Sequence, residues 1–198
     1  PLRDVYKRQV VLGGSMSCQD DAEAPWLAPT RQLISRTVRA GTPFLGICLG
    51  HQLATVALGG QVCTSDHFCL GAAEMHLTPE GKKDPLLSVY DGHRGIHFNN
   101  DVAVVLPEDA VLLARDPTGQ IEAVRFAERA WGVQFHPECT PEIFDAWTIG
   151  HGEKEWQQRL PWSEAVTVAE TVRRDIDTVN AEEAFAARFQ ELIDPEKR

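Results

Sequence analysis

The sequence predicts a three-layer α/β domain, in which a mainly parallel sheet is flanked by helices. Two observations predict this class. Short apolar runs of strand length alternate with longer segments whose apolar residues recur at helical spacing. Glycines stand where many of these segments end, as expected for turns and helix caps. The chain has 198 residues and is 43% hydrophobic, which is enough for one domain with a sizeable core.

The first half of the chain shows this alternation most clearly. A strand is expected over 10–12, ending at a glycine pair, and a helix from residue 30 to a cap at Gly41. The next strand is expected over 43–48 and the next helix over 49–58. Such a strand–helix–strand–helix order favours parallel strands with helices on both faces of the sheet.

The second half predicts several short strands and then helices. The short apolar segments lie at 61–62, 73–77, 102–106 and 111–114. Segments 121–126 and 131–135 are expected to pair as a hairpin. Beyond Pro141 the pattern is helical to the end, with Phe185, Phe189 and Leu192 on one face of the last helix. No repeat and no second domain are visible.

Composition narrows the class of function. The formal net charge is -10, which disfavours nucleic acid and anionic membranes as partners because both would be repelled. No apolar run approaches the ~18 residues that a membrane-spanning helix needs. The five cysteines are an odd number without the spacing of a disulfide framework. A reducing cytoplasm is therefore the expected location.

The segment G-I-C-L-G-H-Q, residues 46–52, is the first candidate for chemistry. Gly46 and Gly50 flank Cys48 two positions away on each side, where an apolar strand meets a helix. This spacing is typical of a nucleophile elbow, with cysteine in place of serine. The positive end of the helix dipole would favour the thiolate. A buried structural cysteine is the alternative interpretation of this spacing alone.

The segment W-G-V-Q-F-H-P-E, residues 131–138, supplies a partner for the thiol. A strand delivers His136 at its end, Pro137 stops the strand pairing, and Glu138 follows. A thiol nucleophile needs a base, and the base needs an acceptor that fixes its tautomer. Cys48, His136 and Glu138 supply these three roles if their strands are neighbours. Taken singly, the histidine and glutamate have ordinary structural interpretations.

These paired motifs resemble those of the class I glutamine amidotransferases. The turn V-L-G-G-S-M, residues 11–16, is similar to the family's oxyanion strand, G-G-P-M. The stretch D-D-A-E-A-P-W-L-A-P, residues 20–29, resembles a freestanding branch related to the glutaminase of GMP synthetase. The resemblance implies a flavodoxin-like fold and hydrolysis of the side-chain amide of glutamine or a related γ-glutamyl amide. It implies no cofactor and no metal, and a separate synthetase as the acceptor of ammonia.

The resemblance also implies roles for single residues. Cys48 would form the thioester, with His136 as acid and base and Glu138 holding its other ring nitrogen. The backbone amides of Gly14 and Leu49 would form the oxyanion hole.

The resemblance further implies that Gln52 helps to hold the substrate. On the residues alone, an amide on a helix surface is an equally good interpretation of that position.

Some positions depart from the family pattern. Ser15 stands where relatives usually have proline, and Cys69 where they often have an acidic residue. In the segment H-F-N-N-D, 97–101, Asn99 and Asn100 replace a histidine and a glycine. These changes leave the triad intact and bear on which amide fits the site.

The N-terminal stretch also departs from the pattern. Residues 1–9 are mostly polar, have no initiating Met and abut an apolar run, so we expect a non-native leader; a short native tail is the alternative. Residues 10–198 then form a single domain with a helical C-terminal part. Relatives have an earlier β–α–β unit before the glycine pair, and we expect a sheet without this unit and with an unpaired edge.

Three other interpretations stay open. Cys48, His51, His136 and Cys139 make a formal zinc-ligand set of two cysteines and two histidines. A γ-glutamyl peptidase of related fold would share the nucleophile and the histidine. An interaction module without catalysis would retain the fold alone.

Overall fold

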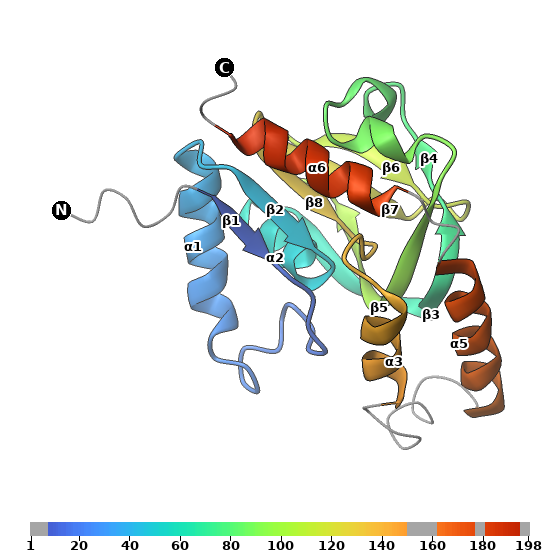
Figure 1. Ribbon diagram of the computed structural model, residues 1–198. Helices are drawn as coiled ribbons and strands as arrows, with labels where there is room; N and C mark the ends of the chain where they lie inside the picture. Colours follow the sequence, from blue (N-terminus) through green and yellow to red (C-terminus); the bar gives the residue numbers. More distant parts are fainter. Residues whose placement is uncertain (1–7, 150–161, 177–180, 195–198) are drawn as a thin grey trace.

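The computed structural model describes residues 8–149, 162–176 and 181–194. Its strands are β1 (Gln9–Val11), β2 (Phe44–Ile47), β3 (Gln61–Glu74), β4 (His76–Leu77), β5 (Arg94–Val105), β6 (Val111–Arg115), β7 (Ile121–Ala127) and β8 (Ala130–Val133). Its α-helices are α1 (Leu27–Arg39), α2 (Leu49–Ala57), α3 (Pro141–Ile149), α5 (Trp162–Ile176) and α6 (Glu182–Ile193), and two 3₁₀ turns are η1 (Gly81–Lys83) and η2 (Leu87–Tyr90). Figure 1 shows their arrangement.

A six-stranded sheet in the order β1-β2-β8-β7-β6-β4 forms the middle layer. Strands β1, β2 and β8 are parallel, whereas β7, β6 and β4 are antiparallel to their neighbours, so the sheet is mixed. The α/β class predicted from the sequence is confirmed, but the sheet is mixed and not mainly parallel, because β7, β6 and β4 pair antiparallel. The parallel pairing of β2 with β8 aligns Leu45 with Trp131 and Ile47 with Val133. The strands that precede the Cys48 turn and the His136 segment are therefore neighbours.

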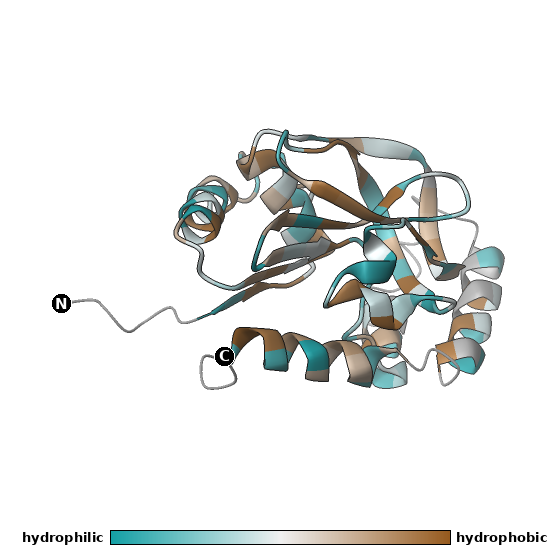
Figure 2. Cartoon of the chain, turned by 90° about the horizontal axis from the view of Figure 1, so that it is seen from above, coloured by the Kyte–Doolittle hydropathy of each residue, from teal (hydrophilic) through white to brown (hydrophobic). Residues whose placement is uncertain are grey.

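The two faces of the sheet carry separate apolar clusters. Alternate residues of a strand point to opposite faces. Leu45, Ile47, Trp131 and Val133 pack with Phe185 and Phe189 of α6 on one face. Phe44 and Ala130 pack with α1 and α2 on the other face, against Ile34, Leu49 and Leu53. Figure 2 shows hydrophobic strands between the helices of the two outer layers.

Helices α1 and α2 form where the apolar spacing predicts them. Helix α1 begins at Leu27, three residues before the expected start; Pro29 is tolerated because the first turn needs no amide donor there. Helix α2 ends at Ala57, and Gly59 takes a positive φ of 102° just beyond the Leu58 cap. Among the described residues, no helix combines the length and apolar character that crossing a membrane requires.

The ribbon formed by β3 and β5 differs from the expectation. The sequence predicts short strands in this region, whereas the structure has a 14-residue and a 12-residue strand paired antiparallel. The polar run at 64–67 interrupts the apolar alternation, and a register shift lies between Thr64 and Cys69. An irregularity of this kind lets a long strand bend without ending. It places Thr64 opposite Asp101 beside the α2 N-terminus.

Strand β1 lies at one edge of the six-stranded sheet. It begins at Gln9, which pairs with Phe44 and whose side-chain carbonyl accepts a hydrogen bond from Thr37 at 2.9 Å. The strand thus includes the last residue of the stretch expected to be a leader. Residues 1–7 of that stretch lie outside the described residues, and the boundary at residue 9 stays a prediction.

Candidate active site

The turn between β2 and α2 holds Cys48 in a strained backbone conformation. Its φ is 49° and its ψ is -108°. Among the described residues other than glycine, Cys48 alone has a positive φ. Such a conformation costs of order 1–3 kcal/mol and persists where the surrounding structure enforces it. It is the backbone geometry of a nucleophile elbow.

The two flanking glycines are required for close packing. A Cβ at Gly50 would lie 2.0 Å from the carbonyl oxygen of Val11 in β1. A Cβ at Gly46 would lie 2.6 Å from the backbone of Gly50. Neither glycine has a positive φ. The strain is therefore carried by Cys48 itself, and the glycines let β1, β2 and the start of α2 approach one another around it.

The segment after β8 is fixed from two sides. The amide of Gln134 donates to the carbonyl of Glu122 in β7 at 2.8 Å, and the amide of His136 donates to the carbonyl of Ile96 in β5 at 2.8 Å. The amide of Cys48 donates to the carbonyl of Val133 at 2.8 Å. Backbone hydrogen bonds thus connect the two segments on which the sequence analysis relied.

His136 and Glu138 form a hydrogen-bonded pair. Nδ1 of His136 lies 2.8 Å from Oε1 of Glu138, and their side chains are 5% and 28% exposed. Burial disfavours the charged imidazolium, but hydrogen bonding and charge from Cys48 and Glu138 outweigh it and raise the pKa of His136 to about 10. The pair therefore favours a protonated imidazole beside the thiol.

Cys48 and His136 meet above Gly13. A Cβ at Gly13 would lie 3.0 Å from Cε1 of His136 and 3.6 Å from Cβ of Cys48, so both side chains crowd the same point. Nε2 of His136 is buried and has no nitrogen or oxygen partner among the described residues. Cys48 is nevertheless close enough to raise the histidine pKa. The thiol is thus adjacent to the nitrogen that Glu138 leaves available.

The two residues expected to form the oxyanion hole also lie together. A Cβ at Gly14 would lie 2.8 Å from the side chain of Leu49, and Gly14 lines the pocket that contains Cys48. Leu49 is the first residue of α2, and an amide at that position has no partner inside its helix. Their role as oxyanion donors stays a prediction.

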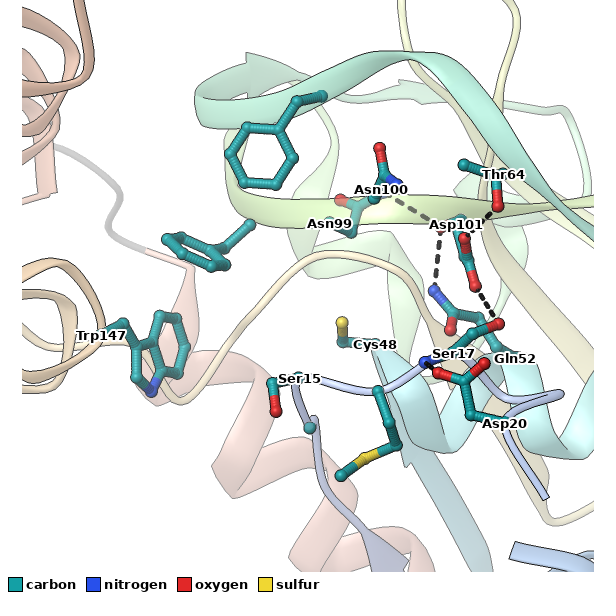
Figure 3. Close-up of a pocket in the computed structure, with 14 residues that line it drawn as sticks. Ser15, Ser17, Asp20, Cys48, Gln52, Thr64, Asn99, Asn100, Asp101 and Trp147 are labelled. Carbon is teal, nitrogen blue, oxygen red and sulfur yellow. Dashed lines mark hydrogen bonds between the residues drawn. The ribbon is translucent and has the colours of Figure 1, made fainter. Parts of the chain in front are cut away.

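A pocket of about 270 Å³ opens over Cys48, which is near the small end of the range for ligand sites. Figure 3 shows Cys48 between two unlike ends: Trp147 on one side, and Gln52, Asp20 and Asp101 on the other. The lining residues are Gly14, Ser15, Met16, Ser17, Asp20, Cys48, Gln52, Thr64, Phe68, Phe98, Asn99, Asn100, Asp101 and Trp147.

One end of the pocket is polar and acidic. The carboxylate of Asp101 accepts hydrogen bonds from Ser17 Oγ at 2.5 Å and Thr64 Oγ1 at 2.9 Å. Asp20 accepts a hydrogen bond from the amide of Ser17 at 2.7 Å. Gln52 is buried, and its Nε2 donates to the carbonyl of Asp101 at 2.9 Å. This leaves the carbonyl of Gln52 as the atom available to a ligand, and its predicted substrate contact stays a prediction.

The other end of the pocket is aromatic. The ring of Trp147 lies 4.5 Å from that of His136, centroid to centroid. Phe98 lies 5.9 Å from Trp147, and Phe68 lies 5.5 Å from Phe98. Three aromatic side chains from α3, β5 and β3 thus extend from the histidine along one wall of the pocket.

Most of these pocket residues carry no recognisable signal in the sequence. An isolated tryptophan in a helix gives no signal of a ligand site, so nothing in the sequence marks Trp147 as a pocket residue. Ser17 and Asp101 are 84 positions apart, so no local spacing could indicate their contact. The segment H-F-N-N-D carried the available signal for Asp101, since it resembles a family motif.

The alternative zinc site is not supported by the arrangement of its four residues. The ring of His51 stacks on Phe126 at 5.9 Å and lies against Gly132, in the layer of α1 and α2. Burial lowers the pKa of His51 to about 4. In the described part of the chain, no three His, Cys, Asp or Glu side chains are placed to share a metal ion.

The fold and the pocket together define a class of protein. A cysteine on a strained strand-to-helix turn beside a histidine–carboxylate pair is typical of enzymes that use a thiol nucleophile. The model of the glutamine amidotransferase class-I family matches residues 4–150. The chain therefore belongs to the class I glutamine amidotransferase family, as the sequence resemblance predicted.

Individual relatives support this assignment. A glutamine amidotransferase-like protein of Salmonella typhimurium is 31% identical over 159 residues, covering 78% of this chain and 66% of that protein. One subunit of the glutamine-hydrolysing GMP synthase of Methanothermobacter thermautotrophicus is 29% identical over 146 residues, covering 70% of each chain. The chain thus spans just under two thirds of the length of the Salmonella relative.

A solved structure shows the same fold. A glutamine amidotransferase from Thermotoga maritima matches with a TM-score of 0.80 at 22% identity, covering 98% of this chain and 80% of that one. At this identity the likeness establishes the fold alone.

Proposed function

We propose that this chain hydrolyses the side-chain amide of glutamine or of a related γ-glutamyl compound through a cysteinyl thioester. The observation that carries the proposal is the backbone strain at Cys48. The one non-glycine residue with positive φ in the described part of the chain lies in a pocket, beside the buried His136. Backbone strain of this kind gathers at functional sites. Membership of the class I glutamine amidotransferase family supports glutamine as the substrate.

In the first half of the proposed reaction, the thiolate of Cys48 attacks the γ-carbonyl carbon. The carbon–sulfur bond forms, and the negative charge that develops on the carbonyl oxygen is met by the amides of Gly14 and Leu49. His136 donates its proton to the departing nitrogen, and the carbon–nitrogen bond breaks. The raised pKa of His136 suits this step, because the imidazole enters it protonated.

In the second half, water hydrolyses the glutamyl thioester. His136, now neutral, takes a proton from the attacking water, and the sulfur leaves as thiolate. Glu138 holds Nδ1 of His136 at 2.8 Å and so keeps Nε2 directed toward the sulfur and the water. The chemistry proposed here is carried by side chains and backbone amides and needs no metal or cofactor.

The acidic end of the pocket suits the glutamyl part of the substrate. The carboxylates of Asp20 and Asp101 complement the α-ammonium group of glutamine. The amide of Asn99 adds a polar group: this residue is 5% exposed and its Oδ1 makes no hydrogen bond within the described residues. We propose that Gln52 supports this end through the carbonyl oxygen that its contacts with the protein leave available.

The released ammonia would be used by a separate synthetase. The Methanothermobacter relative is named as one subunit of a glutamine-hydrolysing GMP synthase, and by analogy we propose a synthetase partner for this chain. All five cysteines are free in the structure, which fits the proposed reducing cytoplasm.

The direct test is glutamate release from glutamine by the whole chain and by Cys48→Ala. We expect the variant to lose at least about a thousandfold of kcat, as enzymes that lose their nucleophile do. Cys63→Ala is the matched control, because Cys63 is exposed and does not line the pocket. It should retain full activity.

Thermal melts accompany the assay, so that a loss of activity is not confused with a loss of fold. Equal rates for the wild-type chain and Cys48→Ala would exclude Cys48 as the nucleophile.

A further inference from the structure

The two unlike ends of the pocket point to a substrate class. We propose that the site prefers γ-glutamyl amides whose leaving amine carries an alkyl or aryl group without a carboxylate, over glutamine itself. This inference rests on the proposed function and specifies which amine departs. Its basis is the aromatic wall formed by Phe68, Phe98 and Trp147, which extends from His136.

The position of His136 decides which end of the pocket receives the leaving group. A general acid must lie within hydrogen-bond reach of the nitrogen that it protonates. The leaving nitrogen therefore lies on the side of Cys48 nearest His136. Trp147 is on that side, since its ring packs 4.5 Å from the imidazole, while Asp20, Asp101 and Gln52 lie on the other side of Cys48 in Figure 3. The glutamyl part then occupies the acidic end, and the amine occupies the aromatic end.

Ammonia is too small to contact the aromatic wall as a leaving group. A leaving group of one nitrogen ends at His136, whereas the wall continues through ring contacts from Trp147 to Phe98 and from Phe98 to Phe68. An alkyl or aryl substituent on the nitrogen continues in that direction and covers apolar surface that is otherwise open to the pocket. Burying such surface is favourable in proportion to its area, and aromatic rings also stack on one another.

A carboxylate on the leaving group is disfavoured at this end. No Lys, Arg or His side chain is among the described residues that line the pocket. A carboxylate placed against Trp147 and Phe98 would lose water and gain no cation there other than His136, whose proton passes to the leaving nitrogen. This separates simple amines from the amino acids that leave a γ-glutamyl peptide.

The proposed step is balanced as it is for glutamine. The Cys48 sulfur forms a bond to the γ-carbonyl carbon, the bond from that carbon to nitrogen breaks, and the amine departs with the proton of His136. Water then cleaves the thioester and gives glutamate. No oxidant, reductant or further reactant is involved.

The test compares four substrates that all yield glutamate: glutamine, γ-glutamylethylamide, γ-glutamyl-2-phenylethylamide and γ-glutamylphenylalanine. The last two have the same aromatic group and differ by one carboxylate. N-alkyl amides are not intrinsically more reactive than glutamine, so a preference for them reports on the pocket. For the phenylethylamide we expect a kcat/KM at least about tenfold above that for glutamine, and at least about tenfold above that for the phenylalanine compound.

Variants of the aromatic wall identify the residues responsible. Phe98→Ala should lower the ratio of kcat/KM for the phenylethylamide to that for glutamine by about tenfold. Phe68→Ala should lower it by less, because the ring of Phe98 contacts Trp147 and the ring of Phe68 contacts Phe98. The ratio is the readout, so a general loss of activity does not count. Trp26→Ala is the matched control: Trp26 is 48% exposed and does not line the pocket, and it should leave the ratio unchanged.

The outcomes separate this inference from the proposed function. If wild-type protein hydrolyses glutamine at least as well as the phenylethylamide, the inference is wrong and the proposed function stands. If γ-glutamylphenylalanine is the best substrate, the leaving group is a peptide amino acid and the inference is again wrong. If none of the four releases glutamate, both fail. If Phe98→Ala and Phe68→Ala fold and leave the substrate ratio unchanged, the aromatic wall does not select the leaving group.

Discussion

Two histidine–glutamate pairs lie at the core of this molecule, and they differ in what their second ring nitrogen contacts. In the first, Nδ1 of His136 contacts Glu138 at 2.8 Å and Nε2 is left beside Cys48. In the second, Nε2 of His97 contacts Glu122 at 2.6 Å and Nδ1 contacts the carbonyl of Gly95 at 3.0 Å. His97 therefore has both nitrogens occupied by acceptors, and His136 has one available for proton transfer.

The two pairs also differ in access to the pocket. The side chains of His97 and Glu122 are 4% and 2% exposed, whereas Glu138 is 28% exposed. Burial disfavours charge on His97, but the charge and hydrogen bond of Glu122 outweigh it and raise the pKa of His97. The second pair is thus a buried ion pair beside the strand segment that carries His136. In the proposed mechanism the same two residue types thus serve chemistry in one place and structure in the other, and of the two histidines only His136 has a ring nitrogen without an acceptor among the described residues.

The largest effect expected from this comparison is the loss of activity caused by His136→Asn. Asparagine keeps a polar side chain toward Glu138 but cannot transfer a proton to the leaving amine. We expect kcat/KM for glutamine to fall by about 10²–10⁴-fold. The melting temperature should fall as well, because the raised pKa of His136 stabilises the fold, but it should stay above the assay temperature. Steady-state glutamate release and a thermal melt measure the two quantities. A variant that keeps wild-type activity would remove His136 from the proposed mechanism.

The converse effect is expected for His97→Asn. Removing one partner of a buried ion pair leaves an uncompensated charge on Glu122 and costs about 3–5 kcal/mol. For a chain of this size that is a fall of roughly 6–20 °C in Tm. Below its melting transition the variant should retain most of its activity, because His97 has no nitrogen directed at the pocket.

A third pair in the same molecule serves as the control for His97. His76 and Glu74 lie 3.7 Å apart, with side chains 58% and 72% exposed. Surface pairs contribute about 0–1 kcal/mol, so His76→Asn should change Tm by no more than a few degrees. Equal Tm changes for His76→Asn and His97→Asn would contradict the assignment of His97 and Glu122 as a buried structural pair.

The comparison also shows which parts of the site could be predicted from the sequence. The pairing of His136 with Glu138 was predictable, because the two residues are separated by a single proline at the end of an apolar strand. The Cys48 turn was predictable for a similar reason, since its glycines stand at a strand–helix junction. Both signals are local. That β2 and β8 lie side by side could be expected once a parallel sheet was predicted.

The second pair had no such signal. His97 and Glu122 are 25 positions apart, and each lies in a strand whose pairing depends on the whole sheet. The β3–β5 ribbon was missed because its polar segment at 64–67 breaks the alternation that identifies strands. With the ribbon unpredicted, neither the position of Asp101 nor the approach of Phe98 to Trp147 could be anticipated. The local motifs around Cys48 and His136 could therefore be predicted from the sequence, whereas the residues that form the walls of the pocket could not.

The smallest effect expected from the comparison is a pH dependence of stability. A histidine whose pKa is raised by folding stabilises the native state fully below the ordinary value of 6.5 and loses this contribution as pH rises through the raised pKa. His97 and His136 both belong to this class, and the pKa of His136 is raised to about 10. The Tm of wild-type protein should therefore decline between about pH 6.5 and pH 8.5.

Substitution of His97 measures how much this histidine contributes to the fall of Tm with rising pH. In His97→Asn the contribution of His136 remains and that of His97 is gone, so the fall in Tm across the same window should be smaller than in wild-type protein. His76→Asn, whose histidine is exposed, should reproduce the wild-type slope. Melts by circular dichroism at half-unit pH steps measure these slopes. If His97→Asn keeps the wild-type slope, folding does not raise the pKa of His97, and the assignment of His97 and Glu122 as a buried ion pair is wrong.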